Sequence, residues 1–244
     1  MASERGEVPD TGFGRAVRRI GAQLRKTLLK LRLGQRWEQT ESGLRRRVYP
    51  DYDTYIAHQK TKFDAARGKF VRRHDQRFYD ALTERLTALA TELKGRSVLC
   101  IAARQGTEVR AFIDRGAFAI GIDLNPGRAN RYVVTGDFHA LQYADGSVQV
   151  AYTNSLDHAY ELDRVLAEIH RVLVADGLLI AELNGGDDEP SAAGFYESSS
   201  WSSIDDMTRR IEAHGFRLEQ RSRFEVPWRG EQLVLRRTVT RPAA

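Results

Sequence analysis

The sequence predicts an α/β fold, a doubly wound seven-stranded sheet whose last strand runs antiparallel. Three observations lead to this expectation. Short apolar runs of strand length alternate with helical patterns between residues 97 and 183. The first run stops at a small-residue turn, 102–106, and a helical pattern follows at once. Residues 216–240 hold two further strand patterns separated only by a hairpin turn, which makes the final strand antiparallel to its predecessor.

An N-terminal helical extension is expected to precede this sheet. Residues 1–12 are small, polar and charged, which is typical of a disordered tail. From Phe13 to Leu31 apolar residues recur in steps of three and four, which predicts an amphipathic helix followed by a linker to residue 47. Eleven Lys and Arg against two Glu fall between residues 13 and 47, so this segment is strongly basic.

Three interpretations of the basic helix stay open. In the first, the helix packs on its own domain. In the second, residues 13–33 bind an anionic membrane surface, and in the third they contact nucleic acid. The last interpretation is the weakest, because no aromatic or Gly-rich module accompanies the charge.

The membrane interpretation predicts salt-sensitive binding to vesicles of anionic lipid. Each Lys or Arg near an anionic surface contributes on the order of 1 kcal/mol, and salt screens the attraction. Deletion of residues 1–34 is expected to abolish vesicle binding and to keep the affinity for the cofactor. Vesicle flotation is the measurement. Protein that stays in the soluble fraction at low salt, or a deletion that unfolds the domain, contradicts the interpretation.

Residues 48–95 are predicted to form a helical cap. One helical pattern covers residues 52–62, and a longer one runs from about 75 to 93 before the helix stop at Gly95. The first pattern has one unusually polar face, made by Tyr55, His58, Gln59 and Lys62. This face is either solvated or lies across the mouth of a cofactor pocket.

Residues 96–244 are predicted to form the main domain. After the run that begins at residue 97, the expected strands are 118–123, 132–135, 148–153, 178–183, 216–226 and 231–240. Helices are expected from 162 to 173 and from 203 to 214, and the connection from 124 to 131 has room for no more than a turn of helix.

The order of strand, tight turn, helix, strand and acid indicates a site for an adenosine-containing cofactor. Sheets of this kind bind nucleotides at the carboxyl ends of parallel strands, beside the amino terminus of the first helix. Asp123 stands at the end of the second strand, where a carboxylate can accept hydrogen bonds from both ribose hydroxyls.

Several motifs stand in the order and spacing of a known family. They are the turn at 98–106, the segments 121–126 and 136–138, the turn at 144–147, Asn154–His158, and the helix, turn and strand start at 168–178. With these motifs the chain resembles the class I S-adenosylmethionine-dependent methyltransferases, particularly the branch called methyltransferase type 11. The resemblance covers residues 96–183 well and the C-terminal hairpin loosely. It implies a Rossmann-like fold, the cofactor S-adenosyl-L-methionine, and methylation of a small molecule or of a sugar or envelope intermediate.

The resemblance also implies which residues bind the cofactor. The turn residues Ala102, Arg104 and Gly106 would pass under its methionine part. Asp123 would hold the ribose, Leu124, Asp137 and Phe138 would bind the adenine, and Asn154 and Ser155 would line the cleft beside the sulfonium methyl. The family's Gly-x-Gly-x-Gly turn keeps only its last glycine here. Arg104 cannot take the left-handed backbone of a glycine without strain, and we expect its guanidinium to pair with the cofactor carboxylate.

Methylation of a hydroxyl requires a base that removes the proton, and histidine suits this task near neutral pH. His158 follows the fourth strand beside Asp157, and this pair is the predicted catalytic unit for O-methylation. His139 and His58 are the next candidates, and the alternative role for His158 is to cap a helix or to pack. No metal site is expected, because adjacent acids such as those at 187–189 are typical of a solvated loop.

The composition of the chain limits where the protein is expected to reside and which classes of function it can have. No run approaches the ~20 apolar residues of a membrane span, and the N-terminus lacks the apolar segment of a signal peptide. The one cysteine, Cys100, falls in a predicted buried strand, so we expect a cytoplasmic protein, peripheral at the membrane if its N-terminal helix binds there. Two other function classes stay open. One is a non-catalytic protein that binds the nucleoside or a partner, and the other is a nicotinamide-dependent oxidoreductase, which would normally keep more turn glycines.

Overall fold

The computed structural model of the protein divides into two compact units, residues 1–36 and 37–244. In the first unit it describes Ile20, Gly21, Leu24, Thr27 and Leu28, which are helical, and Arg36. In the second it describes residues 37–40, 43–65, 69–185 and 194–238, and the side chains of all of these except 63–72. The predicted tail 1–12, most of the predicted helix 13–31 and the acids 187–189 therefore lie outside the described residues.

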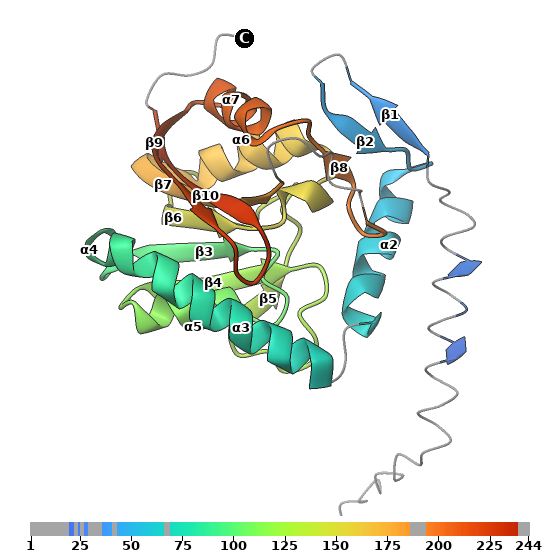
Figure 1. The fold of residues 1–244 in the computed structure, drawn as a ribbon, viewed down its shortest axis with the longest axis horizontal. Coiled ribbons are helices and arrows are strands. Elements are labelled where there is room, and N and C mark those ends of the chain that lie inside the picture. Colours follow the sequence, from blue (N-terminus) through green and yellow to red (C-terminus); the bar gives the residue numbers. More distant parts are fainter. Residues whose placement is uncertain are drawn as a thin grey trace, which may run out of the picture. The chain divides into compact units, whose positions relative to one another are not determined.

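Seven strands of the second unit form one sheet, in the order β5-β4-β3-β6-β7-β10-β9 (Figure 1). Their bounds are β3 Ser97–Ile101, β4 Phe118–Asp123, β5 Val133–Thr135, β6 Val148–Thr153, β7 Leu173–Asn184, β9 Phe216–Phe224 and β10 Gly230–Arg237. Strands β3 to β7 pair in parallel, whereas β10 runs antiparallel to both of its neighbours. The predicted Rossmann-like, doubly wound sheet with an antiparallel last strand is confirmed.

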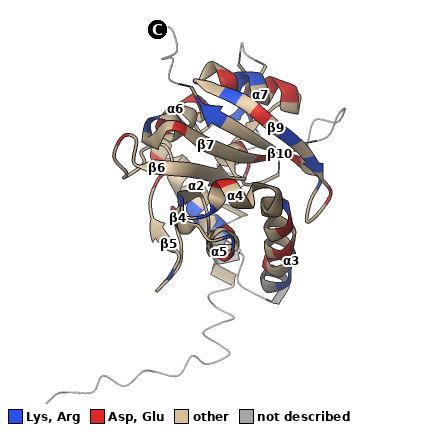
Figure 2. Ribbon diagram, turned by 90° about the vertical axis from the view of Figure 1, so that its left-hand side faces the viewer, with Lys and Arg blue, Asp and Glu red and all other residues tan. Residues whose placement is uncertain are grey.

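Helices cover both faces of this sheet (Figures 1 and 2). Their bounds are α2 Tyr52–Ala65, α3 Lys69–Arg85, η1 Leu86–Leu89, α4 Ala90–Leu93, α5 Thr107–Asp114, α6 Leu162–Val172 and α7 Ile204–Ala213. Helices α3 and α5 lie on one face and α6 and α7 on the other. Buried side chains such as Leu82 of α3 and Phe112 of α5 pack with Cys100 and Tyr152 of the sheet and fix the position of β3.

A small second sheet was missed by the sequence analysis, which assigned residues 37–47 to a linker. Strands β1 (Trp37–Gln39) and β2 (Arg45–Arg47) form a hairpin, and β2 also pairs with β8 (Ser199–Ser200). The strands are very short and β2 consists of three arginines, so neither length nor apolar alternation predicts them. One of the arginines, Arg47, is buried, and its guanidinium donates to the backbone oxygens of Gly194 and Glu197, each at 2.9 Å.

The element boundaries that differ most from the predicted ones are the starts of the long helix and of β7. The long helix begins at Lys69 rather than near residue 75, and its end tightens into the 3₁₀ turn η1. Strand β7 begins at Leu173, so the turn predicted near Gly177 is part of the strand. The connection 124–132 holds turns and no helix, which agrees with the expected room for no more than a turn of helix. Within the described ranges, no helix combines the length and the apolar character needed to cross a lipid bilayer.

Candidate functional site

A cleft of about 600 Å³, part of it open to solvent, lies at the carboxyl ends of β3, β4 and β6. Its walls are Tyr55, Gln59, Lys62, Ala102, Arg104, Ile122, Asp123, Leu124, Asn125, Gly136, Phe138, Ser155 and His158. Six of the nine predicted cofactor-binding residues line it, and so does His158.

The turn after β3 holds three left-handed residues. Gly106 has φ 85°, and a Cβ added there would lie 2.6 Å from Cβ of Tyr132, so only glycine fits. Ala102 and Arg104 also have positive φ, 59° and 42°. Left-handed backbone costs a non-glycine residue about 1–2 kcal/mol, so both positions are strained, as expected for Arg104. The Arg104 guanidinium lines the cleft and lies 3.8 Å from the carboxylate of Asp75.

Glycine at these two strained positions is expected to separate stability from cofactor binding. Both Ala102→Gly and Arg104→Gly relieve left-handed strain, and this gain exceeds the cost of the added entropy of the unfolded chain. The free energy of unfolding is therefore expected to rise by about 0.5–1 kcal/mol in each variant. Only Arg104→Gly removes a cation from the cleft, so only it is expected to weaken binding of S-adenosylhomocysteine. Denaturant titration and calorimetry on both variants measure the two effects. Tighter binding by Arg104→Gly would mean that the side chain obstructs the cleft.

Asp123 keeps its predicted place at the end of β4. Its Oδ2 accepts from the backbone N–H of Arg104 at 3.0 Å, and its Oδ1 accepts from the N–H of Asn125 at 2.8 Å. These bonds tie the turn after β3 to the turn after β4 and hold the carboxylate against the cleft. Each oxygen retains a lone pair for a hydroxyl of a ligand.

Asp137, by contrast, does not line the cleft, and both of its carboxylate oxygens accept hydrogen bonds from other residues of the protein. Its Oδ2 accepts from the hydroxyl of Tyr52 at 2.5 Å, and its Oδ1 accepts from the backbone N–H of His139 at 2.9 Å. Burial raises the pKa of Asp137, but bonds from His139 and Tyr52 outweigh it and hold that pKa below its usual value. Its neighbour Phe138 does line the cleft. The role of Asp137 toward an adenine stays a prediction.

The two alternative histidines have structural contacts. His139 is buried, and its Nε2 accepts from the backbone N–H groups of Tyr160 and Glu161, both at 3.2 Å, just before α6. His58 is fully buried and its Nδ1 pairs with the hydroxyl of Tyr49 at 2.8 Å. Burial lowers the pKa of His58 to about 4, so it is neutral near pH 7. Neither histidine lines the cleft.

One face of α2 closes the cleft. Tyr55, Gln59 and Lys62 line it, so the polar helical face lies across a pocket rather than in solvent. Tyr55 is 0% exposed, and its hydroxyl finds no hydrogen-bond partner among the described residues. Because an unpaired buried hydroxyl is costly, this group is expected to bond to a ligand. The polar stripe was the only sequence signal for these contacts.

His158 also lines the cleft, and its ring is held in a fixed orientation. Its Nδ1 donates to the backbone oxygen of Tyr196 at 2.9 Å, so Nε2 carries the lone pair. Lys62 Nζ donates to this Nε2 at 2.5 Å. Burial lowers the pKa of His158, and the Lys62 cation lowers it further while Asp157 opposes the shift. Burial likewise lowers the pKa of Lys62, to about 8.

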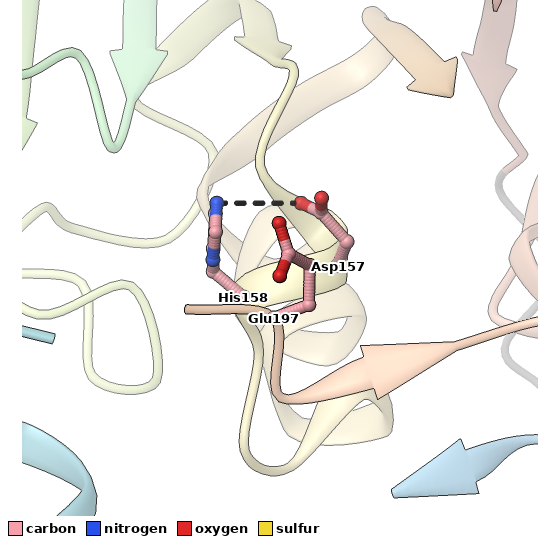
Figure 3. A group of neighbouring side chains, drawn as sticks. All are labelled: Asp157, His158 and Glu197. Atoms are coloured by element: carbon pink, nitrogen blue, oxygen red, sulfur yellow. Dashed lines mark ion pairs between the residues drawn. The ribbon is translucent and has the colours of Figure 1, made fainter. Parts of the chain in front are cut away.

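The predicted partner of His158 lies near it without a hydrogen bond. Oδ1 of Asp157 is 3.8 Å from His158 Nε2, and Glu197 reaches the same place from the segment before β8 (Figure 3). Sequence reasoning missed Glu197, because no local motif places residue 197 beside residue 158. The predicted Asn154 accepts a bond from the Ser155 hydroxyl at 3.0 Å, and of these two only Ser155 lines the cleft.

Residues 99–181 match the model of the family described as the methyltransferase domain. This segment is a class I methyltransferase domain. The chain is 31% identical over 114 residues to malonyl-[acyl-carrier protein] O-methyltransferase 1 of Coxiella burnetii. The match covers 44% of this chain and 40% of that protein, so the chain spans less than half the length of the curated relative.

Solved structures with this fold are more distant in sequence. The Burkholderia thailandensis 1,6-didemethyltoxoflavin-N1-methyltransferase, with bound 1,6-didemethyltoxoflavin and S-adenosylhomocysteine, has a TM-score of 0.65 at 16% identity. It is covered over 99% of its length, against 83% of this chain. The PH0226 protein of Pyrococcus horikoshii OT3 has a TM-score of 0.51 at 18% identity, covering 66% of this chain and 91% of that one.

S-adenosylmethionine is the cofactor of this methyltransferase family, and the cleft fits it. Asp123 offers free carboxylate lone pairs at the strand end, and the Arg104 guanidinium offers a cation for a carboxylate. The orphaned hydroxyl of Tyr55 offers a further buried polar contact. Apolar side chains, among them Leu124 and Phe138, provide surface for an adenine ring.

Proposed function

We propose that this chain transfers a methyl group from S-adenosylmethionine to an oxygen of a small molecule, or of a sugar or envelope intermediate. One observation carries the proposal: a single cleft joins Asp123, where the cofactor ribose is expected, to a desolvated histidine, His158. The name of the Coxiella relative, an O-methyltransferase, supports oxygen as the acceptor atom. The small molecule bound to the Burkholderia enzyme supports an acceptor of similar size.

When bound, S-adenosylmethionine supplies an electrophilic methyl group on a positively charged sulfur. Displacement of this methyl group requires mainly that the protein align the acceptor and exclude water. Tyr55 and Phe138 would exclude water from the cleft, and Arg104 and Asp123 would hold the carboxylate and the ribose of the cofactor. His158 Nε2 takes the proton of the acceptor hydroxyl once Lys62 releases this nitrogen.

Calorimetry tests the cofactor part of this proposal. S-adenosylhomocysteine is expected to bind, and NAD is expected not to bind. Binding of NAD alone would indicate the oxidoreductase alternative. Binding of S-adenosylhomocysteine without any methylated product from pooled sugars, phenols and amines would indicate the non-catalytic alternative, which the strained turn at Ala102 and Arg104 favours.

His158→Gln tests the base. Glutamine keeps a hydrogen-bonding side chain but takes no proton at neutral pH, so the rate of methylation is expected to fall about 10²–10⁴-fold. The affinity for S-adenosylhomocysteine, measured by calorimetry, is expected to stay within twofold. His139→Gln is no control, because His139 bonds to the start of α6. Unchanged methylation by His158→Gln would remove the base role.

A further inference from the structure

Two carboxylates and one imidazole converge at the part of the cleft wall that His158 forms. Asp157, His158 and Glu197 each offer one ligand atom, and these atoms all lie within 4.8 Å of one another (Figure 3). Asp157 and His158 come from the 3₁₀ turn η2 (Leu156–His158) that follows β6, and Glu197 comes from the segment before β8. Two carboxylates and one imidazole are a common donor set for divalent transition metals.

Each carboxylate of this cluster has one buried oxygen without a hydrogen-bond partner among the described residues. Asp157 is 8% exposed, and its Oδ1 has no hydrogen-bond partner among the described residues. The same holds, over those residues, for the buried Oε2 of Glu197. The other oxygen of Asp157 accepts from Asn184 Nδ2 at 3.4 Å. A buried carboxylate oxygen without a donor is costly, so these two atoms indicate a missing positive partner.

The third ligand atom is oriented in the way metal-binding histidines are. The N–H of His158 Nδ1 bonds to the backbone oxygen of Tyr196, which leaves the Nε2 lone pair directed at the cluster. Tyr196 and Glu197 are themselves held in place. Gln59 Nε2 donates to the backbone oxygen of Tyr196 at 2.8 Å, and Arg47 Nε donates to the backbone oxygen of Glu197 at 2.9 Å.

Lys62 now occupies the position beside His158 Nε2, where its ammonium donates at 2.5 Å. A lysine is a compact cation on a flexible four-carbon stem, and Lys62 lines the open cleft, so its head group can move away. Its single charge faces two carboxylates, Asp157 and Glu197, which both favour its charged form. A divalent cation would offset both charges.

We propose that Asp157, His158 and Glu197 form a binding site for a divalent transition-metal cation, such as Mn²⁺, which displaces the Lys62 ammonium. Three protein ligands leave coordination positions open toward the cleft, where an oxygen of the acceptor can bind. That consequence rests on the proposed function, whereas cation binding itself does not. In the cation-loaded protein His158 Nε2 is a ligand, and coordination of the acceptor hydroxyl lowers the pKa of that hydroxyl; the base role belongs to the cation-free protein.

Loss of the electron paramagnetic resonance signal of free Mn²⁺ tests this site. The titration uses the full-length, metal-stripped protein without cofactor or acceptor, so its outcome does not depend on methyl transfer. The wild-type protein is expected to bind about one Mn²⁺ per chain. Asp157→Asn and Glu197→Gln each remove a ligand, so they are expected to weaken binding by at least the roughly 10–100-fold that loss of an outer-shell partner costs. Glu161→Gln is the matched control, because Glu161 lies outside the cluster and its partly exposed carboxylate pairs with Arg164. Its affinity is expected to equal that of the wild type.

Lys62→Met keeps the test decisive if the lysine competes strongly. Removal of the ammonium is expected to tighten Mn²⁺ binding at least severalfold, and thermal unfolding verifies that each variant is folded. The proposal is overturned if neither the wild type nor Lys62→Met binds Mn²⁺, or if Glu197→Gln binds as tightly as the wild type. Binding of S-adenosylhomocysteine to the same samples, measured by calorimetry, reports separately on the proposed function.

Discussion

Glu182→Ala is expected to lower the free energy of unfolding by about 3–5 kcal/mol, the cost of breaking a buried ion pair. Glu182 lies on β7 and is 2% exposed. Arg85 at the end of α3 binds it with two bonds, Nε to Oε1 at 2.7 Å and Nη2 to Oε2 at 2.9 Å. Tyr152 and Gln232 donate to the same carboxylate at 2.9 and 3.0 Å. Alanine would leave a largely buried guanidinium and two buried donors without this acceptor.

The matched control for this loss is Glu219→Ala. Glu219 also binds an arginine through two bonds, to Arg236 at 2.7 and 2.8 Å, but both side chains are partly exposed. Its removal is expected to cost less than about 1 kcal/mol, because water replaces the lost contacts. Urea titrations with unchanged slope measure both values. Equal losses in the two variants would contradict this expectation, since Glu182 is buried among its donors whereas water reaches both Glu219 and Arg236.

Most of the sheet was predictable from the sequence because its strands are buried on both faces. Phe118–Asp123 and Val148–Thr153 were predicted at their observed bounds, since such strands read as continuous apolar runs that end at turn residues. The hairpin Trp37–Arg47 was not predictable in this way. Its stability depends on pairing with residues 199–200 and on the contacts of Arg47 with the segment before them, which are remote in sequence.

Site residues that belong to a local sequence pattern were likewise predictable, and those brought together only by the fold were not. Asp123 and the turn at 102–106 were predicted because strand, turn and acid follow one another in the chain. The wall contributed by α2 was left as one of two interpretations, because a polar helical face has the same pattern against solvent as against a pocket. Glu197 was missed, since only the folded chain brings it to His158. Local patterns thus predicted the cofactor end of the cleft better than the acceptor end.

Asp123→Ala is expected to weaken binding of S-adenosylhomocysteine by about 1.5–3 kcal/mol, the range for losing hydrogen bonds to a charged group. This corresponds to roughly a 10- to 150-fold rise in the dissociation constant. The carboxylate faces the cleft, and bonds from the N–H groups of Arg104 and Asn125 hold it there. The substitution therefore removes the ribose acceptor and also loosens the turn that passes under the cofactor.

Two further variants separate these effects in the calorimetric titration. Asp123→Asn retains one acceptor oxygen and is expected to lie between the wild type and Asp123→Ala. Asp145→Ala removes an acid that is 81% exposed and paired with Arg171, outside the cleft lining, so its affinity is expected to be unchanged. If Asp123→Ala binds S-adenosylhomocysteine as tightly as the wild type does, the cofactor does not bind beside β4 and the assignment of this cleft is wrong.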